Sequence, residues 1–219
     1  MNAVTAAPHP VFYIAIALFL ALLPLLAGVG TAYLKVSIVL GVLRSGLGTT
    51  QIPGNLVIGA LAFGITLQIM HPVFERSLKA GEGITIASLA QTPLHEIPGA
   101  VNRVVEPWRD FLRAHSGPRE IHFLQEMTKP PSIQPHEGRV RILLGAFLLS
   151  ELKDAFRMGF FILLPFVAID LIVANLLVGL GMMMVSPVMI ALPLKLLLLV
   201  YTDGWLLIVK GLISSYGVQ

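Results

Sequence analysis

Four ionisable side chains lie within otherwise apolar stretches of the sequence: Asp170, Lys195, Asp203 and Lys210. A charge at bilayer depth costs about 2.5 to 3.5 kcal/mol on insertion scales, so each group needs an opposite charge, a water-filled cavity or a position outside the lipid. Asp203 and Lys210 are seven positions apart, close to two helical turns, so a continuous helix would place them on one face. These residues are the first candidates for functional or structural ion pairs.

Lys195 stands within "LPLKLLLL", where no acidic residue is close enough along the chain to pair with it. Its partner must therefore come from another segment, and Glu151 and Asp170 are candidates, in the same chain or in a second copy. Alternatively, the lysines extend their ammonium groups to a membrane interface, which suits Lys210, by the C-terminus, better than Lys195.

A second cluster joins flexible, soft and helix-breaking residues: Gly179, Gly181, Met182, Met183, Met184 and Pro187. Consecutive residues of a helix point about 100° apart, so three methionines on a helix cannot all face one core. If the glycines loosen the helix and the proline ends it, the methionines form a loop between antiparallel helices and can project into one opening. Methionine adapts to contacts of varied shape, and it equally suits the filling of an irregular apolar turn. A thioether copper site is a weaker alternative, because no His or Cys lies nearby.

The remaining residue types form no catalytic or metal-binding pattern. Cysteine is absent, and no metal-ligand spacing is matched by the histidines of the polar middle segment, which include His95, His115, His122 and His136. No G-x-S-x-G or phosphate-loop setting surrounds Ser150, Ser186, Ser214 or Ser215. We therefore expect solvated surface histidines, no metal, no cofactor and no enzymatic activity.

The composition is that of a membrane protein. Of 219 residues, 56% are hydrophobic and only 12% are charged, and the mean hydropathy is +0.83. The formal charge of +3 is spread along the chain without a basic run, so the sequence offers no footprint for nucleic-acid binding.

Residues 1–70 form an N-terminal apolar segment and a first hairpin. The 20 residues 11–30 carry no charge and are long enough to cross a bilayer. A cleaved signal peptide is the alternative, but residues 1–10 contain no Lys or Arg, so we expect the segment to be retained. Gly, Thr, Pro and Asn at 44–55 predict a turn. The following run, 56–70, is short for a membrane span and could pack inside an assembly instead.

A polar segment and a second apolar block complete the chain. Residues 71–141 hold 17 of the 27 charged residues and form a water-exposed insert, with an amphipathic helix over 93–123 interrupted at Pro98 and Pro107. Residues 142–219 form the C-terminal helical hairpin with the methionine loop. The predicted fold is an all-α, membrane-associated protein in which two apolar helical hairpins flank a polar, partly helical insert.

Few charged residues indicate the orientation of the chain across the membrane. Lys35 and Arg44 are the only charged residues between the first two apolar runs. The positive-inside tendency therefore places their turn in the cytoplasm and predicts a periplasmic insert on the opposite side of the membrane.

Long motifs in the sequence resemble the FliP-type family, the export-gate proteins of bacterial flagella and of type III secretion injectisomes. They are "LLPFVAIDLIVANLLVGLGMMMVSPVMIALPLKLLLLVYTDGWLLIVKGLI", "ELKDAFRMGF", "LRSGLGTTQIPGN" and "IMHPVFE". The resemblance covers roughly residues 25–75 and 140–216 and leaves the insert unmatched. One departure is Gly54, where the family pattern suggests a second proline.

The resemblance implies an all-helical subunit that assembles as a pentamer with two smaller export-gate membrane proteins into a helical, cone-shaped pore. The pore would stand in the bacterial inner membrane, raised toward the periplasm among other basal-body and export components, and would conduct unfolded proteins. The long first segment and the lack of a basic n-region favour the injectisome branch.

The resemblance also implies residue roles. Met182, Met183 and Met184 would form a gasket that seals the pore, and Glu151 and Lys195 would pair between neighbouring subunits. From the residues alone, an ion-coupled secondary transporter with a midplane site of Asp170, Asp203 and Lys195 is the alternative, although the two apolar halves show no convincing repeat.

Overall fold

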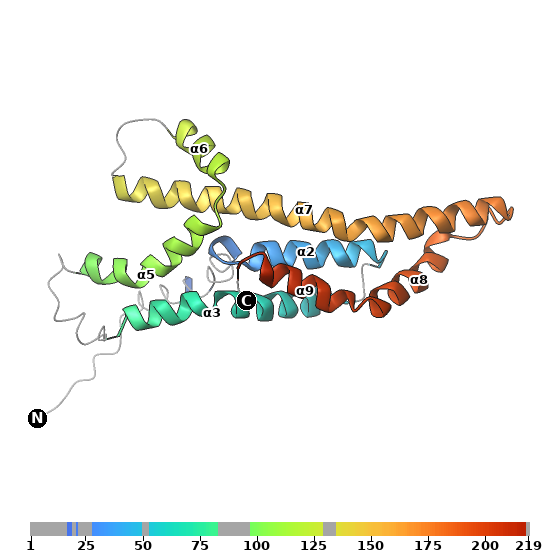
Figure 1. Ribbon diagram of the computed structural model, residues 1–219, viewed down its shortest axis with the longest axis horizontal. Coiled ribbons are helices and arrows are strands. Elements are labelled where there is room, and N and C mark those ends of the chain that lie inside the picture. The colour runs from blue at the N-terminus through green and yellow to red at the C-terminus, as the bar shows by residue number, and fades with distance from the viewer. Residues whose placement is uncertain are drawn as a thin grey trace, which may run out of the picture.

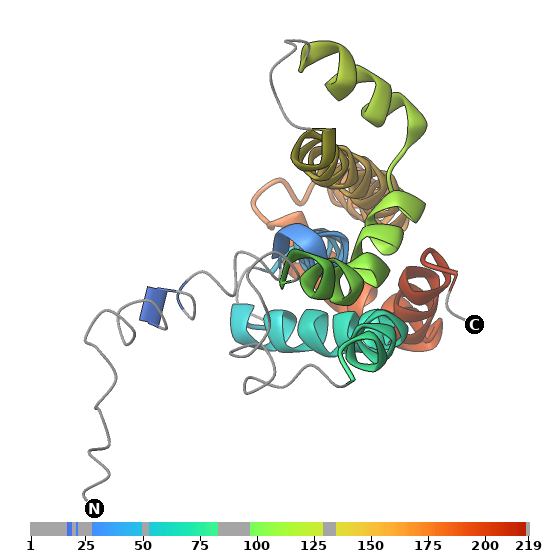
Figure 2. The ribbon, with the colours of Figure 1, turned by 90° about the vertical axis from the view of Figure 1, so that its left-hand side faces the viewer.

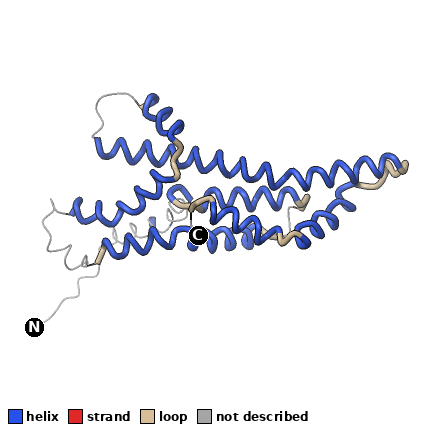
Figure 3. Tube along the Cα trace, in the orientation of Figure 1, coloured by secondary structure: helices blue, strands red, loops and turns tan. Residues whose placement is uncertain are grey.

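The computed structural model describes residues 17–18, 21, 28–49, 53–82, 97–128 and 135–217. Within them the chain folds into helices joined by short loops, without a strand (Figures 1 and 3). The helices are α2 (Tyr33–Gly46), α3 (Asn55–Ala80), α5 (Ile97–Ala114), α6 (Pro118–Met127), α7 (Pro135–Gly179), α8 (Pro187–Tyr201) and α9 (Gly204–Ser214). The prediction of an all-α protein is confirmed.

Helix α7 is the longest of the described helices. Its 45 residues span about 67 Å at the helical rise per residue, twice the thickness of a hydrocarbon core. Helix α2 packs along α7 on one side and against α3 on the other, as the end-on view of Figure 2 shows. The main core draws buried apolar side chains from all sides of this arrangement, including Leu40 of α2, Ile69 of α3, Phe111 of α5, Phe147 of α7 and Leu212 of α9.

Helix α3 is longer than the apolar run that predicted it. The run 56–70 ends where polar residues begin, but the helix continues to Ala80 and contains Pro72. The charged side chains beyond Met70 lie on the exposed face of the helix, so the change in composition does not mark the end of α3. The boundary drawn between residues 70 and 71 therefore lies inside α3, and that between 141 and 142 lies inside α7.

Among the described residues of the insert, α5 and α6 lie wholly within it, and the break between them differs from the prediction. Both prolines lie within α5, so the predicted interruption at Pro107 is wrong. Next to it, Trp108 Nε1 donates to the carbonyl of Gly30 at 2.8 Å and anchors α5 to the N-terminal part of the chain. The break comes instead at Gly117, whose N–H donates to Ser150 Oγ of α7 at 2.7 Å, and Pro118 then begins α6.

Among the described residues, two helices are long and apolar enough to cross a membrane: α3 and the part of α7 from Val140 to Gly179. Helices α8 and α9 would form a third span if counted together, although they are bent by 61° where they meet. The prediction of a span at residues 11–30 lies largely outside the described residues.

Candidate functional site

The loop that joins α7 to α8 stands at the far tip of the molecule (Figure 1). Helix α7 ends after Gly179 with a Schellman motif, in which the N–H of Gly181 donates to Val178 O at 3.0 Å and that of Met182 to Leu177 O at 2.9 Å. Gly181 has a φ of +73°, a conformation in which glycine has no Cβ penalty. Pro187 is the first residue of α8, where its missing N–H has no cost. Gly181 thus ends one helix and Pro187 begins the next.

The three methionines of this loop project away from the chain's own core. The exposed fraction is 45% for Met182, 81% for Met183 and 100% for Met184. Residues that merely filled an apolar turn would be covered by neighbouring side chains, so their exposure disfavours the filler interpretation.

The hairpin that carries the loop also presents large apolar side chains outward. They include Phe160, Phe161, Leu171, Ile172 and Leu176 of α7 and Leu197, Val200 and Tyr201 of α8. Buried contacts within the distal hairpin are fewer and centre on Val173, Leu177 and Ala191. An outward face made of so many large apolar side chains fits lipid or another protein subunit, and not water.

Lys195 joins three helices at the base of this hairpin. Its Nζ donates to Asp170 Oδ2 of α7 at 2.7 Å and to the carbonyl of Gly46, the last residue of α2, at 2.9 Å. The Lys195 side chain is only 4% exposed, whereas that of Asp170 is 45% exposed. Because the end of α2 carries unpaired carbonyls and a partial negative charge, the ammonium group is stabilised from two directions. Within the chain, Lys195 therefore pairs with Asp170 and not with Glu151.

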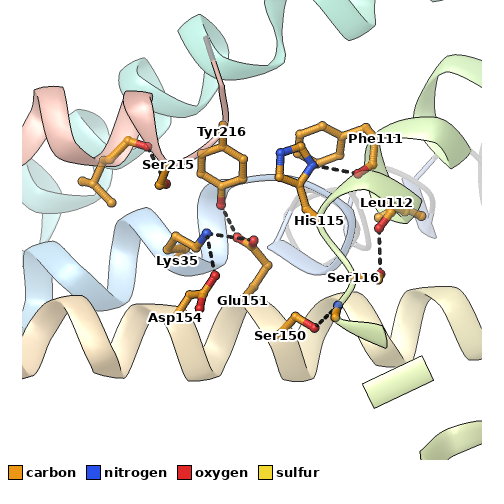
Figure 4. Close-up of polar contacts among 12 residues, drawn as sticks. Lys35, Phe111, Leu112, His115, Ser116, Ser150, Glu151, Asp154, Ser215 and Tyr216 are labelled. Atoms are coloured by element: carbon orange, nitrogen blue, oxygen red, sulfur yellow. Dashed lines mark hydrogen bonds and ion pairs between the residues drawn. The ribbon is translucent and has the colours of Figure 1, made fainter. Parts of the chain in front are cut away.

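Glu151 belongs to a separate buried cluster between α2, α7 and the C-terminal turn (Figure 4). Lys35 Nζ lies 3.0 Å from Glu151 Oε1, and the two side chains are 2% and 1% exposed. The Tyr216 hydroxyl donates to the other oxygen of Glu151, and Lys35 Nζ lies 4.3 Å from the centroid of the Tyr216 ring. Asp154 Oδ2, 3.6 Å from Lys35 Nζ, adds a more exposed carboxylate.

The surroundings of Tyr216 keep its hydroxyl protonated. Burial, together with the charge of the Glu151 carboxylate, raises the pKa of Tyr216 well above its ordinary value. The ring also packs at a centroid distance of 6.0 Å from Phe111 and 4.9 Å from His115. His115 is thus half-buried in this cluster, which corrects the expectation that all insert histidines are solvated.

Lys35 also changes the argument for orientation. It was assigned to the turn between apolar runs, but it lies in α2 and is neutralised by Glu151, so it contributes no free positive charge at a membrane surface. Arg44, which donates to Asn55 across the turn, remains. Sequence reasoning missed Lys35 and Tyr216 as site residues. The available signal was a lone lysine in an apolar helix, which needs a buried acidic partner.

Asp203 and Lys210 do not form an ion pair with each other. Asp203 precedes α9 in the left-handed conformation, with a φ of 49°, and Lys210 lies within α9. Both side chains are exposed, and neither makes an ion pair with another described residue. The transporter hypothesis required Asp203 beside Asp170 and Lys195, and Asp203 does not join that pair. In the part of the chain that the structure describes, no three His, Asp or Glu side chains are grouped as they would be around a metal ion.

Comparison with known proteins agrees with the motifs. The profile of the FliP family matches residues 16–212. The Yop proteins translocation protein R of Yersinia pestis is 37% identical over 215 residues, which cover 96% of this chain and 98% of the relative. The chain belongs to the FliP family. The matched range includes the insert, which the motifs had left unassigned, so the insert is part of the FliP-family domain.

This FliP-family chain is similar both to proteins named for secretion and to proteins named for flagellar biosynthesis. The hypersensitivity response secretion protein HrcR of Ralstonia nicotianae is 36% identical over 208 residues, covering 93% of this chain and 95% of the relative. The flagellar biosynthetic protein FliP of Caulobacter vibrioides is 35% identical over 200 residues, covering 90% and 73%. These identities are nearly equal, so assignment to the injectisome branch stays a prediction. Pairing of Glu151 with Lys195 between subunits also stays a prediction, and it would require each residue to exchange its partner within the chain.

Proposed function

We propose that this FliP-family chain is a structural subunit of a protein export gate, in which several copies surround a pore for unfolded proteins in the bacterial inner membrane. The names of the relatives, which refer to translocation, secretion and flagellar biosynthesis, support a role in protein export. The observation that carries the pore hypothesis is the exposed methionine loop at the tip of the α7–α8 hairpin. The subunit's contribution is structural and involves no catalysis.

In this proposal the methionines of neighbouring copies meet around the pore axis and form a gasket. A single chain leaves the apolar side chains of Met183 and Met184 exposed, which is unfavourable in water and becomes favourable when copies cover each other. Unbranched thioether side chains can repack around different unfolded segments and close again when the pore is empty. The Schellman motif and Pro187 fix where the loop begins and ends, so its position is defined while its side chains remain adaptable.

The exposed apolar faces of α7 and α8 are the proposed contacts with neighbouring subunits. The resemblance implies five copies and two smaller export-gate membrane proteins as partners, in a complex raised toward the periplasm. Contacts of this kind would cover side chains such as Phe160 and Leu176 that the single chain leaves exposed. Native mass spectrometry of the extracted protein, alone and with the two partners, tests the number of copies.

The gasket is tested by replacing Met182, Met183 and Met184 together with alanine. We expect the assembly to form and the membrane to leak small ions at a rate several times that of the unmodified complex, measured as conductance in vesicles. Met127→Ala on α6 is the matched control, because Met127 is similarly exposed but lies outside the loop. Unchanged conductance in a fully assembled triple variant would remove the gasket role while leaving membership of the export apparatus intact.

A further inference from the structure

A polar cavity of about 220 Å³ lies where the end of α5 meets α2, α7 and the C-terminal turn. The charged and titratable side chains in its wall are Lys35, His115, Glu151 and Asp154. Figure 4 shows these four side chains together with Tyr216, whose ring is 4.9 Å from that of His115. Histidine is the side chain whose charge changes between about pH 5 and 8, so the charge balance of this cavity depends on pH within that range.

The hydrogen bond of His115 determines which ring nitrogen can take up a proton. Its Nδ1 lies 2.8 Å from the carbonyl oxygen of Phe111, which can only accept, so Nδ1 carries a hydrogen and donates it. A neutral imidazole has a single N–H, so Nε2 then has a free lone pair. No described residue forms a hydrogen bond with Nε2. His115 can therefore gain its second proton at Nε2 without breaking its bond to Phe111.

The charges that face His115 from other helices favour its protonated form. Glu151 Oε1 and Asp154 Oδ2 of α7 lie 3.0 and 3.6 Å from the same ammonium group, that of Lys35. One cation thus faces two carboxylates, so the wall of the cavity carries one negative charge in excess while His115 is neutral. A proton on His115 makes the wall neutral overall, which stabilises the imidazolium.

The other charges near this corner of the molecule balance each other. Glu120 of α6 and Lys153 of α7 form an ion pair at 3.0 Å. On α5 itself, Arg113 and Asp110 are exposed, and their charged groups are 3.9 Å apart. The Tyr216 hydroxyl of the C-terminal turn is neutral, because burial raises the pKa of Tyr216 well above its ordinary value. Among the described residues, no further cation cancels the excess negative charge of the cavity.

The end of α5 adds a second attraction for a charged imidazole. The helix ends at Ala114, and the carbonyl of Phe111 is one of its last four, where the helix dipole places a partial negative charge. The rings of Phe111 and Tyr216, at 4.5 and 4.9 Å from the imidazole ring, also attract a cation. Desolvation opposes the charge, but His115 is only half-buried and its cavity has room for water.

We propose that His115 is a proton-binding residue whose charged form holds the corner between α5 and α6 more tightly against α7 and the C-terminal turn. Two hydrogen bonds already attach this corner to α7, from Gly117 N–H to Ser150 Oγ at 2.7 Å and from Ser116 Oγ to Leu143 O at 3.3 Å. The imidazolium adds an attraction that is present at acidic pH and is lost as the pH rises through the histidine range. The proposal is independent of the pore hypothesis, because it concerns only the attachment of the insert.

Hydrogen exchange of the full chain in detergent, corrected for intrinsic rates, measures this attachment in residues 111–120 and 212–217. We expect exchange in both segments to be about threefold to tenfold slower at pH 5.5 than at pH 8. His115→Gln, which cannot be charged, should exchange at the fast rate at both pH values. His115→Arg, which keeps its charge throughout, should exchange at the slow rate at both. His122→Gln is the matched control and should keep the pH dependence, because His122 is exposed on α6 outside the cavity wall.

Asp154→Asn tests the charge balance without altering the imidazole. It removes the excess negative charge, so the difference between the two pH values should shrink by about half or more. Because Asp154 is largely exposed, this variant keeps the test decisive if His115→Gln does not fold. An unchanged pH dependence in either variant would overturn the proposal. So would faster exchange at pH 5.5 than at pH 8 in the unmodified chain, or an equal loss of the pH dependence in His122→Gln.

Discussion

Replacing Lys35 with methionine tests the buried ion pair between α2 and α7. The variant leaves Glu151, which is 1% exposed, without its cation. Removal of one partner from a buried pair typically costs about 3 to 5 kcal/mol, because the remaining charge is buried and uncompensated. We expect the lower value, because Tyr216 still donates to Glu151 and an adjoining cavity of about 220 Å³ can admit water.

Thermal unfolding of the detergent-purified chain measures this cost. For a chain of this size, about 1 kcal/mol corresponds to 2 to 4 °C, so a loss of 3 kcal/mol lowers the melting temperature by about 6 to 12 °C. Lys79→Met is the matched control, because Lys79 is exposed on α3 and makes no ion pair with a described residue. It should change stability by no more than about 0.5 kcal/mol.

Second-site variants separate the charge effect from lost packing. Adding Glu151→Leu should recover most of the stability, because a well-packed apolar pair often replaces a buried ion pair without loss. The Tyr216 hydroxyl then lacks its acceptor, at a cost of about 1 to 3 kcal/mol, and Tyr216→Phe should remove that cost. If the Lys35 and Glu151 double variant is less stable than Lys35→Met alone, the uncompensated charge is not the cause and the reasoning is refuted.

Two further predictions concern the attachment of α6 and the contact of α2 with α7. The hydrogen bond from Lys153, at 3.0 Å, holds the pKa of Glu120 in the folded chain below its ordinary value. The ionised Glu120 therefore stabilises the contact of α6 with α7 above about pH 4, and this stabilisation is lost as the pH falls through the pKa of Glu120 in the folded chain. Because Lys153 is exposed, the stability lost on protonation of Glu120 is below about 1 kcal/mol. Glu120→Gln should abolish the pH dependence of hydrogen exchange in α6, after correction for intrinsic exchange rates. A pH dependence that persists in Glu120→Gln would contradict this assignment. Gly46→Ala places a Cβ 2.8 Å from two α7 side chains and should lower the stability measured by thermal unfolding by about 1 to 3 kcal/mol. In the control Gly41→Ala, in the same helix, the new Cβ meets nothing within 4 Å and should stabilise the chain. Equal effects of the two variants would contradict this packing of α2 on α7.

The sequence was most informative where local chemistry determines the structure. Gly181 and Pro187 each have a strong positional preference, and together they predict where the α7–α8 loop lies. Apolar periodicity likewise predicts the helices. It failed to locate the end of α3, because a helix continues through polar residues when they fall on its exposed face. It also failed at Pro107, which α5 tolerates.

The ion pairs were less predictable because they depend on long-range packing. Lys195 requires an acidic partner on energetic grounds, but both Glu151 and Asp170 satisfied that requirement in the sequence. Only the packing of α2 beside α7 decides between them, because it brings Lys35 to Glu151 and leaves Asp170 for Lys195. No local pattern indicated that Tyr216, at the end of the chain, closes over Glu151.

The two ion pairs give the export-gate hypothesis a mechanical basis. Glu151 and Asp170 are about 28 Å apart along α7, and each is tied to α2, directly through Lys35 or through Lys195 at Gly46. Beyond Asp170 the hairpin packs mainly on itself, through residues such as Val173 and Ala191. The part of α7 between Glu151 and Asp170 is thus fixed to α2, whereas the methionine loop at the tip has exposed side chains. Because the methionine loop contributes no buried contacts to that part of α7, changes in it should alter sealing without lowering the stability of the subunit, whereas changes at Lys35 should do the reverse.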